Sequence, residues 1–272
     1  MKTYFQERKS KWNPPECKQT PGESRYPFDY CLIMLDGMLP FLRLHFLSLE
    51  QRLKLTDFNS IHVICKNTKS DVKEFCSKYE YINIHELDMY TPKNIDNPWQ
   101  WDMAYNYEYI VECCGDSDFV IMIHPDVDYY NADVYWDGIY NSIRDNVGVV
   151  YEGAMSVVRR EAYISSHLGF WPLMNARYMR PEDDSNGVYI VGNLSPQKIF
   201  SKGKLFNILG IEMFELFCID IQQYGWHSIV IPEISYFARN HISDSSNHDP
   251  ENVEMRKRKL DHVNSRIRKL GG

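Results

Sequence analysis

The sequence has no hydrophobic run long enough to cross a membrane. A membrane helix needs about 18 consecutive apolar residues, whereas the longest apolar runs in this chain of 272 residues are short ones such as Phe119–Ile123. The first residues, MKTYFQERKSKWNPPE, also lack the continuous apolar segment of a secretory signal. Together these two absences predict a cytoplasmic protein.

Cysteine pairs with the spacing of a metal site or a redox motif are also absent. The seven cysteines include no Cys-x-x-Cys pair. An odd number of cysteines fits a reducing compartment better than a disulfide framework. We therefore expect most of them to be small buried hydrophobic residues.

Positive charge is scarce in the body of the chain. The formal net charge is −7, but residues 1–26 carry six basic and three acidic side chains, and residues 251–272 carry seven and three. The part between them is therefore near −14. An acidic body argues against a dedicated duplex-DNA protein, whose affinity rests on cationic contacts to phosphate. The basic termini leave contact with a polyanion, either nucleic acid or an anionic membrane surface, as a prediction.

Hydrophobic segments alternate between the patterns of strands and helices. Short apolar runs predict strands at 30–35, 61–65, 81–87, 119–123, 147–151 and 227–232, and helical spacing predicts helices at 39–53, 70–79, 99–114, 155–168 and 208–224. This order predicts an α/β domain with a mostly parallel sheet flanked by helices, and ligands at the carboxyl ends of its strands.

The length favours one large domain, since domains average roughly 150 residues and no low-complexity linker divides the chain. We expect an extended arm over 1–26, a single domain over 27–248, and a basic helix with little apolar face over 249–272.

Two aspartates follow the most hydrophobic predicted strand, in the sequence His124-Pro125-Asp126-Val127-Asp128. In an extended backbone Asp126 and Asp128 project to the same side. Mg²⁺ and Mn²⁺ take carboxylate oxygens and share them with a diphosphate. Taken alone, such a pair is more often an ordinary turn, but its surroundings favour a metal motif.

Residues 101–130, WDMAYNYEYIVECCGDSDFVIMIHPDVDYY, resemble the central segment of nucleotide-sugar glycosyltransferases with the A-type fold. Asn106 lies in an Ala-x-Asn pattern on the predicted helix, Gly115 begins a Gly-Asp turn, and Asp126 begins the Asp-x-Asp metal motif of that family. The chain departs from the family where Tyr107-Glu108 replaces a glycine. The motif can also be aligned two residues earlier, in a second register in which His124 and Asp126 occupy its two ligand positions. Asp126 is therefore a ligand in both registers.

Residues 210–233 resemble the helix, glycine and strand near the acceptor site of the inverting, family-two-like members of this superfamily. Those enzymes carry an acidic residue about a dozen positions before the glycine, here Gly225. The resemblance therefore implies Glu212, or else Glu215, as the base that takes the acceptor's proton. A structural role is equally consistent with either glutamate, because acidic residues in the first turn of a helix stabilise it through the helix dipole. Asp183, in a polar loop that could close over the acceptor, is a rival for this role.

The same resemblance implies further site residues. The third metal ligand would be His241, after the last strand. The nucleotide would contact residues at strand ends and on the helix before the motif: Leu35, Asp36, Asn67, Asp88, Asn106 and Asp126. Arg159 and Arg160 could neutralise phosphate, although a solvated helix face is the interpretation we favour for them.

These observations predict a metal-dependent glycosyltransferase, hexosyl- or pentosyl-specific and inverting, that uses Mn²⁺ or Mg²⁺ and a nucleotide-diphosphate sugar. Its hydroxyl acceptor is open between saccharide, lipid-linked sugar, protein and modified nucleic-acid base. One alternative is a non-catalytic module that binds glycan or nucleic acid on the same fold. The other is a metal-dependent nucleotidyltransferase, which the absence of a glycine-rich loop after the first strand disfavours.

Overall fold

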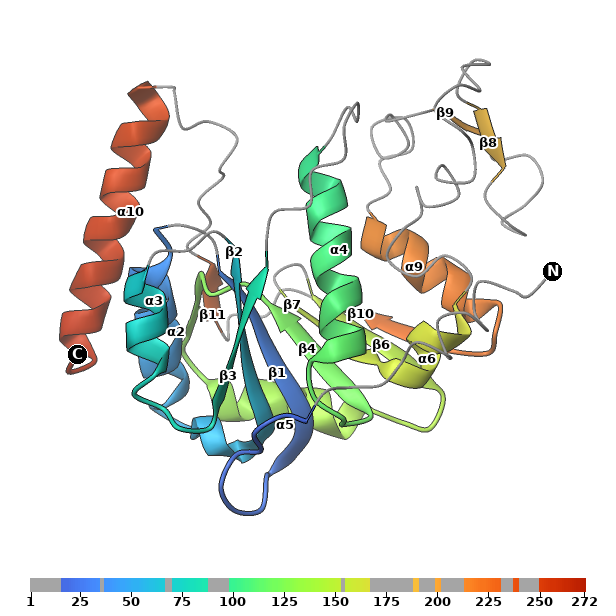
Figure 1. Ribbon diagram of the computed structural model, residues 1–272, viewed down its shortest axis with the longest axis horizontal. Helices are drawn as coiled ribbons and strands as arrows, with labels where there is room; N and C mark the ends of the chain where they lie inside the picture. The colour runs from blue at the N-terminus through green and yellow to red at the C-terminus, as the bar shows by residue number, and fades with distance from the viewer. Residues whose placement is uncertain are drawn as a thin grey trace.

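The computed structural model describes residues 16–34, 37–66, 70–87, 98–152, 155–166, 188–190, 199–201, 213–230, 237–239 and 250–272. Its centre is a seven-stranded sheet in the order β10-β6-β7-β4-β1-β2-β3 (Figure 1). The strands are β1 (Tyr26–Met34), β2 (Phe58–Lys66), β3 (Ile82–Leu87), β4 (Phe119–Ile123), β6 (Val147–Glu152), β7 (Met155–Arg159) and β10 (His227–Val230). The helices are α2 (Leu39–Leu49), α3 (Ser70–Cys76), α4 (Pro98–Cys113), α5 (Ala132–Ser142), α6 (Arg160–Ser165), α9 (Met213–Gln222) and α10 (Pro250–Lys269), with a 3-10 turn η1 (Leu55–Asp57). Two short pairs lie outside the main sheet, β5 (Val127–Tyr129) with β11 (Phe237–Arg239), and β8 (Val188–Ile190) with β9 (Ile199–Ser201).

The main sheet is mostly parallel. β1 runs parallel to both β2 and β4, β2 to β3, and β10 to β6. Only β7 runs against its neighbours β4 and β6. The predicted fold class, a Rossmann-like α/β domain with a mostly parallel sheet flanked by helices, is confirmed.

One element was predicted wrongly. Residues 155–168 were expected to be helical, but the segment begins with strand β7 and only then forms α6. Val157 and Val158 are buried on opposite faces of the sheet. A strand with helices on both sides carries apolar residues without period-2 alternation, so its sequence does not distinguish it from a buried helix.

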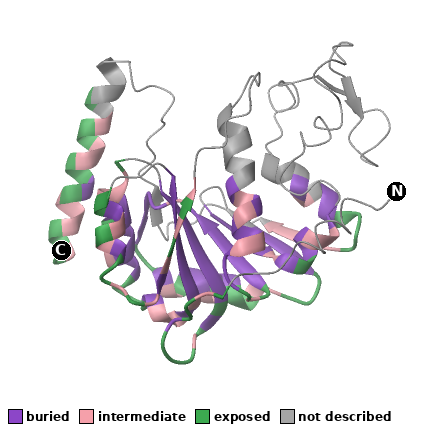
Figure 2. Ribbon diagram, in the orientation of Figure 1, coloured by how far each residue is buried: buried purple, intermediate pink, exposed green. Residues whose placement is uncertain are grey.

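Helices cover both faces of the sheet, which buries its inner strands, whereas the edge strand β3 is partly exposed (Figure 2). On one face α2, α3 and α5 pack over a core that includes Phe46, Cys76 and Trp136. On the other face α4, α6 and α9 contribute residues such as Val111 and Phe217 to a second core. None of the described helices is both long and apolar enough to span a membrane.

The C-terminal helix α10 packs alongside α2 (Figure 1). The expectation that this helix has little apolar face is wrong. Val263 is fully buried and forms a small cluster with Phe41 and Leu44 of α2, and the flanking apolar residues are Leu260, Ile267 and Leu270. The spacing of these residues places them on one side of the helix, while basic residues such as Lys257 remain exposed.

Candidate active site

The Asp126-Val127-Asp128 motif lies at the carboxyl edge of the sheet. Strand β4 ends at Ile123, the chain turns at Pro125 and Asp126, and β5 then begins at Val127. The Asp126 side chain is only 3% exposed. Strand β11 pairs antiparallel with β5 and ends at Arg239, opposite Val127. The structure therefore brings the end of β11 beside the motif.

Strand β5 is fixed by polar groups of α2 and β1. His45 Nδ1 lies 3.0 Å from the Val127 carbonyl oxygen, and the Tyr129 amide donates to Ser48 Oγ at 2.9 Å. Because a carbonyl only accepts, His45 Nδ1 carries the proton. His45 Nε2 then accepts from the Tyr30 hydroxyl at 2.7 Å. The motif is thus held in place by a fully buried histidine.

Burial lowers the pKa of His45 to about 4, despite the opposing effects of its hydrogen bond to Val127 and the nearby charge of Asp126. The imidazole is therefore neutral at physiological pH, as its hydrogen bonds require. The sequence analysis missed His45, Ser48 and Tyr30. The available signal was a histidine on the apolar side of a predicted helix, which more often indicates a buried hydrogen-bonding residue than a ligand.

Asp128 is fully buried and forms an ion pair with α10. Arg266 Nε and Nη2 donate to its two carboxylate oxygens at 2.8 and 3.0 Å. The hydrogen bond to Asp128 is the main reason why the pKa of Arg266 is raised. This planar, two-bond geometry is the strong form of an arginine–carboxylate contact. A residue predicted to bind metal is thus held by a guanidinium from the C-terminal helix.

A buried lysine lies at the carboxyl end of β2, toward the same edge of the sheet. Lys66, the last residue of β2, is 1% exposed, and its ammonium group donates to Asn106 Oδ1 at 3.0 Å. Asn106, a predicted nucleotide contact, is fully buried on α4. β2 and β4 are separated by β1 alone, so the two strands lie roughly 10 Å apart across the sheet, at about 4.8 Å per strand. Lys66 at the end of β2 and Asp126 after β4 thus lie toward the same edge of the sheet, with β1 between their strands.

Of the two predicted catalytic glutamates, only Glu215 lies in the described part of the chain, on a helix that begins near the same edge. Helix α9 leads through Gly225 into β10, which runs parallel to β4, so the first residues of α9 face the carboxyl edge. Glu215 lies in the first turn of this helix. Seven other predicted site residues fall outside the described residues: Leu35, Asp36, Asn67, Asp88, Asp183, Glu212 and His241.

Arg159 and Arg160 lie at the opposite edge, so neither phosphate binding nor a solvated helix face is correct for them. Arg159 pairs with Phe119, the first residue of β4, and its guanidinium lies over that ring. Arg160 is 2% exposed and forms an ion pair with Asp29 at 2.8 Å. It also donates to the carbonyl oxygens of Ser117, Val111 and Cys114. Arg160 therefore ties α4 and β4 to β1.

Comparison with known proteins gives fold-level similarity only. No protein-family model matches the sequence, and no curated protein sequence matches it significantly. Similar solved structures include a mannosyltransferase from Pyrobaculum calidifontis in complex with GDP-Man and Mn²⁺, with a TM-score of 0.43, 9% identity, and coverage of 98% of this chain and 71% of the other. An active-site mutant of LgtC has a TM-score of 0.42, 10% identity, and coverage of 84% and 95%. The 4-diphosphocytidyl-2C-methyl-D-erythritol synthase of Anaerococcus prevotii has a TM-score of 0.41, 10% identity, and coverage of 86% and 98%.

Proposed function

We propose that this protein is a metal-dependent glycosyltransferase that moves a sugar, with inversion, from a nucleotide diphosphate to a hydroxyl acceptor. The observation that carries the proposal is the position of Asp126. It is a buried carboxylate directly after the central strand β4, at the edge where parallel α/β sheets bind ligands. A cytoplasmic location, hexosyl or pentosyl specificity and the class of acceptor are further parts of the proposal.

Of the two registers of the metal motif, His124 with Asp126 fits a divalent cation better than Asp126 with Asp128. Asp128 is the poorer ligand, because its carboxylate is fully buried and each of its oxygens already accepts a hydrogen bond from Arg266. His124 and Asp126 supply one imidazole and one carboxylate, and Mn²⁺ accepts both types of ligand. We infer that these two residues hold the metal together with the donor's phosphates, with His241 as the predicted third protein ligand. When bound, Mn²⁺ or Mg²⁺ would neutralise the departing diphosphate.

The protein's own groups account for the rest of the reaction. Lys66, fixed by Asn106, supplies positive charge near the expected diphosphate. Glu212 or Glu215 at the start of α9, or Asp183, would take the proton from the acceptor hydroxyl as the sugar's anomeric carbon is attacked from behind. His45 keeps β5, and with it the metal motif, in position.

The deciding experiment is release of free sugar from a panel of nucleotide sugars, with and without Mn²⁺. We expect Asp126→Asn to lower this activity roughly a hundredfold or more, the scale of losing one group that stabilises charge. The matched control is Asp137→Asn, because Asp137 forms an exposed ion pair with Arg25. Normal activity in Asp126→Asn would contradict the site. Pyrophosphate release from a nucleoside triphosphate and a sugar phosphate would instead identify a nucleotidyltransferase.

A further inference from the structure

Two histidines and one cysteine from three separate segments meet inside the domain. They are His62 of β2, His85 of β3 and Cys114 at the end of α4. One ligand atom of each residue lies within 4.8 Å of the other two, and His62 and Cys114 are buried. This cluster lies apart from the Asp126 site. Lys66, at the site's edge, is four residues further along β2 than His62, which is about 13 Å at 3.3 Å per residue.

The spacing of the ligand atoms is close to that of a tetrahedral zinc site. His62 Nδ1 lies 2.9 Å from His85 Nε2, and His85 Nε2 lies 3.8 Å from Cys114 Sγ. Tetrahedral angles with Zn–N near 2.05 Å and Zn–S near 2.3 Å require separations of about 3.3 Å between the nitrogens and about 3.6 Å between nitrogen and sulfur. Each observed distance therefore differs from the ideal by less than about half an ångström.

The second nitrogen of each histidine has a partner that orients the ring. His62 Nε2 lies 2.7 Å from Ser60 Oγ, and the Ser60 hydroxyl donates to Asp29 Oδ1 at 2.6 Å. Because Ser60 has one hydroxyl proton, His62 Nε2 must donate to Ser60, which leaves a lone pair on Nδ1 facing the cluster. His85 Nδ1 lies 2.9 Å from the Tyr109 hydroxyl, which can accept its proton. Histidines that bind metals are oriented in this way.

Cys114 is fully buried, and so is the nearby Cys31, whose thiol lies 3.9 Å from the Asp29 carbonyl oxygen. Cysteine binds metal as the thiolate, so Zn²⁺ binding at Cys114 would release the thiol proton.

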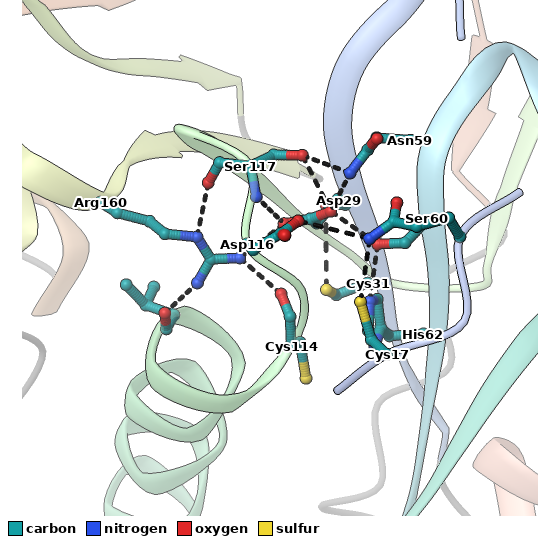
Figure 3. A network of polar contacts seen from close by, with 12 residues as sticks. Cys17, Asp29, Cys31, Asn59, Ser60, His62, Cys114, Asp116, Ser117 and Arg160 are labelled. Carbon is teal, nitrogen blue, oxygen red and sulfur yellow. Dashed lines mark hydrogen bonds and ion pairs between the residues drawn. The ribbon is translucent and has the colours of Figure 1, made fainter. Parts of the chain in front are cut away.

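A network of hydrogen bonds and one ion pair lies behind the cluster. Asp29 accepts hydrogen bonds from Asn59 and Ser60 of β2 and from Ser117, and it pairs with Arg160 (Figure 3). This network fixes Ser60, which in turn fixes the His62 ring. The Nδ1 atom of His62, which faces His85 Nε2, is thus positioned from the protein interior.

We propose that His62, His85 and Cys114 bind one Zn²⁺ ion. Imidazole and thiolate ligands select Zn²⁺ over Mg²⁺ and Mn²⁺, which prefer oxygen. Such an ion would join β2, β3 and the end of α4, so its role is structural. It is distinct from the cation expected at Asp126, and the proposal does not depend on the glycosyltransferase function.

The test is metal binding by the full-length chain, measured by elemental analysis after dialysis and by absorption after Co²⁺ substitution. We expect one Zn²⁺ per chain, and with Co²⁺ a thiolate-to-metal charge-transfer band. Cys114→Ser should abolish that band and weaken Zn²⁺ binding at least about tenfold. The matched control is Cys113→Ser, on the preceding and only partly buried residue, which should keep both properties.

The Asp126→Asn variant distinguishes the proposed zinc site from the proposed metal site at Asp126, because this variant should still bind one Zn²⁺. Equal Zn²⁺ affinity in the wild type and Cys114→Ser would overturn the proposal, and so would bound copper in place of zinc. If Cys114→Ser fails to fold, the wild-type Co²⁺ spectrum still decides. Absence of the thiolate band would show that the three residues form only a hydrogen-bonded chain.

Discussion

Gly115→Ala should destabilise the protein far more than Gly225→Ala, although both glycines have left-handed backbones, with φ of +78° and +87°. A Cβ atom at position 115 would lie 2.2 Å from Asp29 Cγ and 2.3 and 2.5 Å from the Asp29 carboxylate oxygens. At Gly225, by contrast, nothing lies within 4 Å. The comparison therefore isolates the clash from the backbone strain that both variants share.

The clash is costly because the Asp29 carboxylate cannot easily move. It pairs with the buried Arg160 and accepts a hydrogen bond from the Ser117 amide, each at 2.8 Å. The shared left-handed strain costs roughly 1–2 kcal/mol. Displacing Asp29 would break a buried ion pair, which costs about 3–5 kcal/mol more. At about 2–4 °C per kcal/mol, the two variants should differ in Tm by roughly 6–20 °C.

Urea unfolding followed by circular dichroism measures this difference, provided that the slopes of the transitions agree. The double variant Gly115→Ala with Asp29→Ala should be clearly more stable than the sum of the single effects predicts, because removing the carboxylate removes the clash. Free energies of unfolding for Gly115→Ala and Gly225→Ala within about 1 kcal/mol of each other would refute the reasoning.

Arg160→Met should cost about 3–5 kcal/mol of stability, because it leaves Asp29 buried without its charge partner. Urea unfolding should also show that the two residues are coupled, since Asp29→Ala should cost less stability when Arg160→Met is already present than it does in the wild type. Stability should fall as pH drops from about 6.5 toward 4, by up to about 3 kcal/mol, because His45 takes up a proton in the unfolded chain before it does so in the fold. Urea titrations at several pH values check this, and an identical pH profile in His45→Gln would count against it. Arg266→Met should lower stability without metal and increase the rise in Tm caused by Mn²⁺, because Asp128 becomes available as a ligand. An unchanged Mn²⁺ effect would show that Asp128 takes no part.

The sequence predicted the parts of the fold that depend on local patterns. Strands β1 to β4 contain short apolar runs and the helices between them have a helical period, so their order indicated a parallel sheet and its ligand edge. Strand β7 was missed because burial on both faces removes the alternation that identifies a strand. The position of Asp126 at the carboxyl edge followed from the same reasoning.

Contacts between distant segments could not be predicted in this way. Arg266 reaches Asp128 only because α10 docks on α2, and a basic segment by itself gives no docking position. The cluster of His62, His85 and Cys114 has no recognisable spacing in the sequence. Its members come together through the pairing of β2 with β3 and the packing of α4, which are properties of the assembled sheet.

The direction of the strands divides the molecule into two ends with different tolerance to mutation. The Asp29 and Arg160 network lies where the parallel strands begin, and Asp126 lies where β4 ends. A saturation-mutagenesis experiment that scores protein abundance and the proposed transferase activity separately should therefore show opposite patterns at the two ends of the sheet. Substitutions near the beginning of β1 would reduce abundance, whereas substitutions just beyond β4 would reduce turnover in protein that still accumulates. Under the proposed function, changes in acceptor specificity at one end would then leave the stability of the other end unaffected.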